Sequence, residues 1–220
     1  MSEPICINQI KINQLEVQKY SKPSKYLFSD QKDQPKKDIQ SMTVELIADL
    51  LKSICDKNES QALNSNLNLL KSFTTKTAPS ISIKNYLIRL TQFTKMEEST
   101  MIFILIYIDR INNYNKIQLT HRNIYKLILA SALVAIKFNE DVHYSLEVYA
   151  KIGGIPQSEL ENLEYQFLIL LQFTLNVDKS LYDKYSESLL SFRDDEDYEE
   201  ESEEEEKEEE ERNKEDDKCM

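Results

Sequence analysis

The stretch that most restricts the fold runs from Leu127 to Asp141 and reads L-I-L-A-S-A-L-V-A-I-K-F-N-E-D. Ten of its first twelve residues are apolar, and they cover nearly the whole circumference of a helix. A helix that is apolar on all sides is normally buried on all sides. The two exceptions are Ser131 and Lys137, and Lys137 stands where the run ends. We therefore expect a central helix enclosed by others, with a charged end exposed at the surface.

Glycine is very scarce, and this excludes several classes of protein. The 220 residues include two glycines and no tryptophan. Two glycines cannot supply the glycine-rich phosphate loops of nucleotide enzymes or the many tight turns of an all-β fold. Long segments rich in Leu, Ile, Lys and Glu instead favour an all-α protein.

The net charge of −12 is concentrated at one end of the chain. Residues 194–220 contain 18 acidic and 4 basic residues, whereas residues 1–193 contain 21 acidic and 23 basic residues. The tail therefore carries −14 and the rest of the chain +2. Such a tail would repel phosphates, so we expect no nucleic-acid partner.

The cysteines and the apolar runs indicate a cytoplasmic or nuclear protein. Cys6, Cys55 and Cys219 match no metal or disulfide pattern, which favours a reducing compartment. No stretch approaches the roughly 20 apolar residues that span a bilayer. The start M-S-E-P lacks the features of a signal peptide. We expect no membrane association.

The chain divides into a disordered region at 1–40, a helical body at 41–190 and an acidic disordered tail at 191–220. Three five-residue units from Ile5 to Lys19 are either a chance repeat or a short docking segment. Helical spacing over 63–73 is weakened by four asparagines at 58–68. Within the body we expect helices over about 42–57, 83–94, 100–113, 121–138, 146–152 and 156–171, with a last helix from about 179.

Capping residues set the expected ends of these helices. Candidate N-caps are Ser82, Ser99 or Thr100, Thr120 and Ser145. Gly153 and Gly154 end the short helix, because glycine accepts the left-handed conformation at a helix C-terminus. The inward faces should include Leu87, Leu90 and Phe93 in the first helix after Ser82, Leu163 and Leu168 in the helix after Pro156, and Tyr185, Leu189 and Leu190 in the last.

Catalytic chemistry is not indicated. The only histidines, His121 and His143, are expected at a helix start and in a loop. The chain contains no H-E-x-x-H, G-x-S-x-G or P-loop motif. We predict a protein that is not an enzyme and that needs no cofactor or metal.

Three charged residues interrupt apolar patterns. Lys137 lies at a helix C-terminus, where the helix dipole favours a cation. Glu164 lies inside an apolar helix, and Asp109 follows eight apolar or aromatic residues. Unpaired charges are rarely buried, so each must reach a partner or the surface. Two explanations are compatible with this pattern. The charges either lie at helix ends and form an internal salt bridge, or they bind a partner.

Five segments in order resemble a cyclin box of the P/U-type group. They are S-I-S-I-K-N-Y-L-I-R-L, L-I-Y-I-D-R-I, A-L-V-A-I-K-F-N-E-D, Y-A-K-I-G-G-I and L-E-N-L-E-Y-Q-F-L-I-L-L-Q-F-T-L. The resemblance covers about Met42 to Leu190. It implies a single box of five helices, with the third surrounded by the other four, plus an N-terminal helix. We expect no second box, because no apolar helices follow Leu190. A single box is usual in this group.

The resemblance also implies a function. Cyclins bind and activate a cyclin-dependent kinase as its regulatory subunit, in a heterodimer. A lysine late in the third helix and a glutamate in the fifth hold the kinase near its movable αC helix, and these roles fall on Lys137 and Glu164. The alternative is a cyclin-fold adaptor that binds a non-kinase protein without activation.

Other residues match structural positions of the box, namely Tyr86, Asp109, Gly153 and Gly154. Many cyclins pair the aspartate with an arginine early in the first helix, but Ser80 stands there in this chain. Arg89 is a candidate substitute, so the partner of Asp109 stays open. The acidic tail is either a solubilising extension or an electrostatic arm, modified at Ser202, that recruits basic substrates or masks a basic patch.

Overall fold

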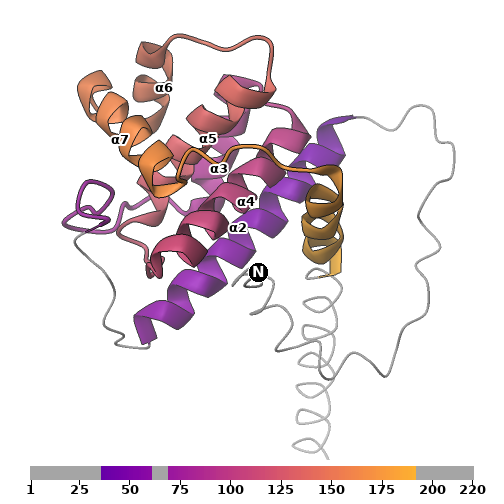
Figure 1. The fold of residues 1–220 in the computed structure, drawn as a ribbon, viewed down its shortest axis with the longest axis horizontal. Coiled ribbons are helices and arrows are strands. Elements are labelled where there is room, and N and C mark those ends of the chain that lie inside the picture. Colours follow the sequence, from indigo (N-terminus) through magenta and orange to yellow (C-terminus); the bar gives the residue numbers. More distant parts are fainter. Residues whose placement is uncertain (1–35, 61–68, 192–220) are drawn as a thin grey trace, which may run out of the picture.

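The computed structural model describes residues 36–60 and 69–191, with side chains from residue 42 onward. These residues form helices and no strands, as the all-α prediction requires (Figure 1). The helices are α2 (Lys36–Ser60), α3 (Ile83–Thr94), α4 (Glu98–Asn115), α5 (Ile124–Asn139), α6 (Leu146–Gly153) and α7 (Gln157–Leu170). A further helical segment covers 179–191. The predicted repeat at 5–19, most of the segment 63–73 and Ser202 lie outside the described residues.

Helix α5 is the centre of the bundle, which confirms the prediction. It packs against α3, α4, α6 and α7. Twelve of its sixteen residues are buried, on every side of the helix. Ser131, the polar residue within the run, donates a 3.1 Å hydrogen bond to the carbonyl of Ile104 in α4. The hydroxyl is therefore satisfied in the core, and small side chains around it allow the neighbouring helix to approach.

Helix α2 lies across α3 and α4 outside the five-helix box. It is the long helix in indigo and purple that runs diagonally through Figure 1. It begins earlier and ends later than the expected 42–57. Two contacts in its N-terminal half attach it to the box: Thr43 donates to Glu98 at 2.6 Å, and Glu45 pairs with Lys84 at 3.1 Å.

The inward face of α3 differs from the prediction at its end. Phe93 was expected in the core but is 61% exposed. Thr91 and Thr94 are buried instead, because their positions lie nearer the centre of the face that Leu87 and Leu90 define. Each threonine hydroxyl donates to the carbonyl four residues earlier, so its burial leaves no unpaired polar group.

The helix starts agree with the sequence at two caps and differ at two others. Ser82 caps α3 by accepting from the backbone N–H of Asn85, and Ser145 occupies the N-cap position of α6. The cap of α4 is Glu97, and neither Ser99 nor Thr100. The predicted start of α5 was wrong by three residues. Asn123 accepts from the N–H of Thr120 at 2.9 Å, which closes a turn and delays the helix to Ile124.

The end of α6 confirms the glycine prediction. Gly154 has φ +71°, in the left-handed region. Gly153 serves a different purpose, since a Cβ atom there would lie 2.3 Å from Cδ2 of Leu129 in α5. The absence of a side chain at residue 153 allows α6 to approach the central helix closely.

The last two helical segments bury somewhat different residues than expected. In α7 Leu163 is buried as predicted, but Leu168 is only partly buried, and Leu160, Phe167 and Leu170 are buried in addition. In 179–191 Tyr185 and Leu189 are buried, whereas Leu190 is 44% exposed. The expected core position of Leu190 was therefore wrong.

Candidate functional site at the ends of α5 and α7

Lys137 and Glu164 meet at the surface where α5 ends. Nζ of Lys137 lies 2.6 Å from Oε1 of Glu164. Their side chains are 35% and 20% exposed, so the ion pair is partly shielded from water yet accessible. The structure thus brings together the two residues to which the resemblance to a cyclin box assigns the kinase contact, 27 residues apart in the chain.

The position of each residue follows from the burial pattern of its helix. In α5 burial is continuous from Leu127 to Ile136, and the helix then emerges with Lys137, Phe138 and Asn139. The cation is in the last turn, where the carbonyl end of the helix dipole stabilises positive charge. In α7 Glu164 lies between the buried Leu163 and the exposed Tyr165, at the boundary of the apolar face.

Exposed or partly buried apolar residues follow Lys137 and Glu164 along the chain. Phe138 follows Lys137 directly and is 51% exposed, and the partly buried Leu168 lies one helical turn after Glu164. Beyond the end of α7, Phe173 is 63% exposed and has a left-handed backbone with φ 54°. A bulky side chain is uncommon in that conformation, which costs backbone energy. Sequence reasoning missed Phe138 and Phe173 because exposure is not visible in a run of apolar letters.

The segment that carries Phe173 is fixed to α4. The guanidinium of Arg110 donates to the carbonyls of Thr174 at 2.8 Å and Asn176 at 2.9 Å. The hydroxyl of Tyr107 donates to the carbonyl of Leu175 at 2.9 Å. These three bonds use backbone acceptors of an irregular segment, and they hold Phe173 in a defined place relative to the box.

Glu140 links the end of α5 to the start of α4. Its backbone N–H donates to the carbonyl of Ile136 and ends α5. Its carboxylate accepts from the backbone N–H of Glu97 at 3.0 Å and from the hydroxyl of Thr100 at 2.6 Å. A carboxylate at a helix N-terminus is favoured by the free N–H groups and the helix dipole. One residue therefore completes two helix ends and fixes the turn that follows Lys137.

The residues assigned to the frame of the box lie away from this surface. Tyr86 is buried, its ring meets that of Tyr125 edge-on at 5.4 Å, and burial raises the pKa of its hydroxyl. Asp109 is fully buried in α4 and accepts from Asn113 and Tyr185. Arg89 donates to the carbonyl of Lys151 in α6 and is not its partner.

The described residues offer no site for metal chemistry, since no group of three or more His, Cys, Asp or Glu side chains could hold an ion. His121 pairs with Asp56, and His143 is exposed after the end of α5. Within the same residues no helix combines the length and apolar character needed to cross a membrane.

Comparison with known proteins agrees with this architecture. The cyclin family model matches residues 33–175. Cyclin-U4-2 of Arabidopsis thaliana is 33% identical over 159 residues, covering 71% of this chain and 73% of that protein. Cyclin-U4-3 of the same plant is 40% identical over 115 residues, covering 52% of each chain.

A fungal protein is also similar to this chain. PHO85 cyclin-like protein psl1 of Schizosaccharomyces pombe is 35% identical over 122 residues, covering 54% of this chain and 50% of its own. The match therefore spans about half of psl1 and of Cyclin-U4-3. With a helical box around α5 and these matches, the chain belongs to the cyclin family, in its P/U-type group.

Proposed function

We propose that this protein binds and activates a cyclin-dependent protein kinase as its regulatory subunit, in a heterodimer. The observation that carries the proposal is the partly exposed Lys137–Glu164 pair, with Nζ and Oε1 2.6 Å apart and the exposed Phe138 next to Lys137 in the chain. Membership of the cyclin family supports a kinase partner, and so does a relative named PHO85 cyclin-like. In this proposal the kinase supplies all catalytic groups.

The pair is suited to binding protein backbone. A lysine ammonium has three N–H donors and a carboxylate has two acceptor oxygens, so each side chain keeps hydrogen-bonding capacity beyond their mutual bond. Because Lys137 and Glu164 already hold one another, less side-chain entropy is lost when a partner binds. Phe138 and Phe173 add exposed apolar area that such a partner would bury.

Activation follows if the kinase binds this surface better in its active arrangement. A protein kinase is active when its αC glutamate pairs with the β3 lysine and the metal-binding aspartate is in place. A partner shifts that equilibrium only by its difference in affinity for the two states. The end of α5 is well suited to this, since Glu140 and the core fix it within a packed bundle.

The test is reconstitution of the full-length protein with purified cyclin-dependent kinases, including a Pho85-type kinase. We measure the dissociation constant and the rate of phosphoryl transfer for each kinase, with and without the protein. We expect at least one kinase to bind and to be stimulated. Lys137→Ala and Glu164→Ala should each weaken that complex by about 2–5 kcal/mol, which is about 30-fold or more in Kd.

Lys126 and Glu159 provide a matched control. They form a second ion pair between α5 and α7, with Nζ and Oε1 2.7 Å apart, in the first part of both helices. Lys126→Ala and Glu159→Ala should leave kinase binding unchanged. The proposal would be contradicted if substitutions in the two ion pairs weakened kinase binding equally. It would also be contradicted if the folded protein stimulated no kinase. Binding without stimulation would favour the adaptor function.

A further inference from the structure

One end of the molecule carries exposed basic side chains from three segments that lie far apart in the sequence. They come from the C-terminal turns of α2, the segment 69–77 and the loop 116–123, and we call the set the basic pole: Lys57, Lys71, Lys76, Lys116 and Arg122. Hydrogen bonds join the segments. Asn58 donates to the carbonyl of Leu119 at 2.9 Å, and Gln118 donates to the carbonyl of Asn58 at 2.7 Å. Arg122 donates to the carbonyl of Thr75 at 3.0 Å.

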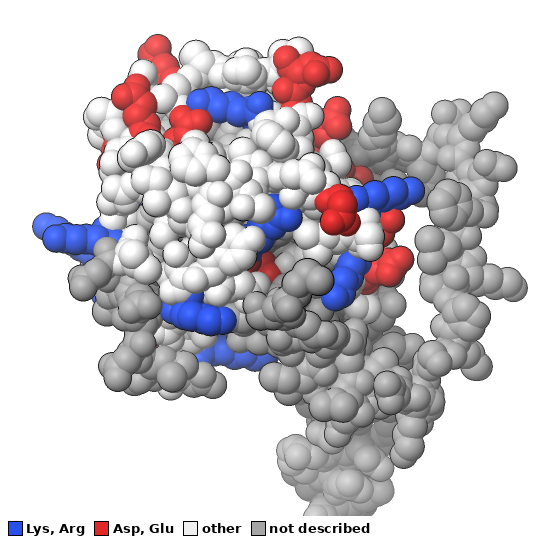
Figure 2. Space-filling view, viewed as in Figure 1, with Lys and Arg blue, Asp and Glu red and all other residues white. Residues whose placement is uncertain are grey.

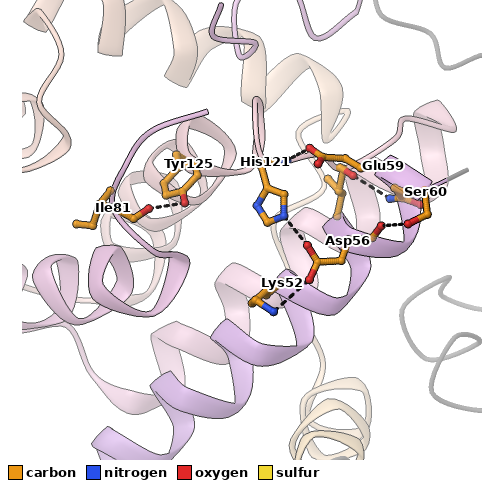
Figure 3. Close-up of polar contacts among 9 residues, drawn as sticks. Lys52, Asp56, Glu59, Ser60, Ile81, His121 and Tyr125 are labelled. Carbon is orange, nitrogen blue, oxygen red and sulfur yellow. Dashed lines mark hydrogen bonds and ion pairs between the residues drawn. The ribbon is translucent and has the colours of Figure 1, made fainter. Parts of the chain in front are cut away.

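The nearby carboxylates are occupied by other partners. Figure 3 shows Asp56 held by His121 at 2.7 Å and by Lys52 at 3.1 Å. Glu59 accepts from the backbone N–H of His121 at 3.2 Å. Within the described part of the chain, none of the five side chains of the basic pole forms an ion pair with a carboxylate. The five cations of the pole outnumber the carboxylates of Asp56 and Glu59, so the pole keeps a net positive charge.

The distribution of charge over one face agrees with this. In Figure 2 basic side chains lie along the left and lower edge of the molecule, where few acidic ones are seen, whereas at the top and right acidic side chains predominate and other basic ones lie among them. The lower left of the same view in Figure 1 contains the C-terminal end of α2. A concentration of one charge sign attracts segments of opposite charge over about one Debye length, roughly 10 Å at 0.1 M salt.

The chain contains a segment of complementary charge. Residues 194–220 carry −14, with 18 acidic and 4 basic residues. They follow the helical segment 179–191 in the same chain, so their local concentration at the surface of the box is high. A segment of 27 residues can extend to about 90 Å, which is more than the diameter of a domain of this size.

We propose that the acidic segment 194–220 binds the basic pole of its own chain. Single surface ion pairs contribute little to stability, so the contact depends on many weak pairs and exchanges readily. Salt weakens it, and an acidic competitor displaces it. Phosphorylation of Ser202 would add about −1.5 to −2 charges to the segment and strengthen the contact. The segment thereby shields the pole from other polyanions.

The chain provides its own labelling site for a test. Cys219 lies in the acidic segment, whereas Cys55 is buried and protected. A nitroxide attached to Cys219 of the full-length Cys6→Ser protein broadens backbone amide signals near the place where the segment binds. At about 10 mM salt, where the Debye length is about 30 Å, we expect selective broadening of residues 57, 71–77 and 116–122. At about 1 M salt, where it is about 3 Å, the broadening should disappear.

Reversing the charge of selected lysines tests whether the acidic segment binds the basic pole or other cations. Lys57→Glu, Lys71→Glu and Lys76→Glu together should abolish the broadening, whereas Lys95→Glu, Lys179→Glu and Lys184→Glu should retain it. The control lysines are also exposed and outside the ion pairs of the described chain. Broadening that is centred elsewhere, or that survives reversal of the pole, overturns the proposal. A pole that binds added polyphosphate but not the segment also overturns it. The experiment uses no kinase, so its outcome is independent of the proposed function.

Discussion

The hydroxyl of Tyr185 donates a 2.5 Å hydrogen bond to Oδ2 of Asp109, a carboxylate with no exposed surface. Asn113 donates to the same oxygen at 2.9 Å. Tyr185 belongs to the helical segment 179–191, which follows the five-helix box, whereas Asp109 lies in α4. The bond therefore attaches the segment 179–191 to the core of the box. It also identifies one partner of Asp109 in a chain that has Ser80 where many cyclins have an arginine.

Replacing Tyr185 by phenylalanine should destabilise the fold. Tyr185→Phe keeps the ring and removes one donor from a buried carboxylate, and such a loss typically costs about 1–3 kcal/mol. Tyr182→Phe is the matched control, because Tyr182 lies in the same segment and its hydroxyl is in no hydrogen bond within the described chain. Its effect should stay within about 0.5 kcal/mol. Urea denaturation measures both, and equal midpoints would contradict the role of the Tyr185 hydroxyl.

The sequence predicts the helices of the box because their burial is periodic and local. The apolar run at Leu127–Ile136 identifies α5, and Gly153 and Gly154 identify the end of α6. What the sequence does not predict are the contacts between residues far apart in the chain. Glu140 and Thr100 are 40 residues apart, and Tyr185 and Asp109 are 76 apart. Only the packed arrangement of helices brings such partners together.

The wrong burial predictions at single residues also result from packing between helices. Phe93 fits an apolar pattern, but packing of α3 against α2 and α6 sets which face is buried, and Thr94 lies closer to its centre. For the site, the resemblance supplied Lys137 and Glu164, and the structure placed them in contact. It could not supply Phe173, whose exposure depends on a left-handed turn after α7.

Gly153→Ala should destabilise the packing of α6 on α5. The new Cβ would lie 2.3 Å from Cδ2 of Leu129, which is 1% exposed and has little room to move. Overpacking of this kind costs about 1–3 kcal/mol. Gly154→Asn is the control, since nothing lies within 4 Å of its Cβ position and asparagine tolerates φ +71°. Thermal unfolding should rank Gly153→Ala as the less stable variant, and the reverse order would refute the close-approach argument.

Glu140→Ala should loosen the start of α4. The loss of a capping side chain costs about 0.5–2 kcal/mol, and the N–H of Glu97 should exchange with solvent faster because its acceptor is gone. Asp141→Ala removes an equal charge from the neighbouring exposed residue and should change neither quantity. Hydrogen exchange followed by NMR compares them. If the N–H of Glu97 stays equally protected in both variants, the Glu140 carboxylate does not hold the start of α4.

Glu140→Ala can also be tested for an effect on the proposed kinase surface. Glu140 fixes the turn three residues after Lys137 without belonging to the ion pair. In the proposed complex, Glu140→Ala should therefore weaken kinase stimulation more than Asp141→Ala, while Lys137 and Glu164 remain present. Equal stimulation by the two variants would show that the cap contributes to stability alone.

The thiol of Cys55 should make the fold sensitive to alkaline pH. Burial, with the nearby Glu59 and Asp56, raises its pKa from 9.0 to about 12. The unfolded chain therefore releases this proton at lower pH than the folded chain, so stability falls as pH rises from about 9 towards 12. The loss at pH 10 is about 1.4 kcal/mol. Denaturation of the Cys6→Ser, Cys219→Ser protein between pH 8 and pH 10 measures this loss of unfolding free energy. Adding Cys55→Ala to the same protein should remove the part of the pH dependence that the thiol causes. An unchanged slope, or rapid reaction of native Cys55 with Ellman's reagent at pH 8, would contradict the buried, protonated thiol.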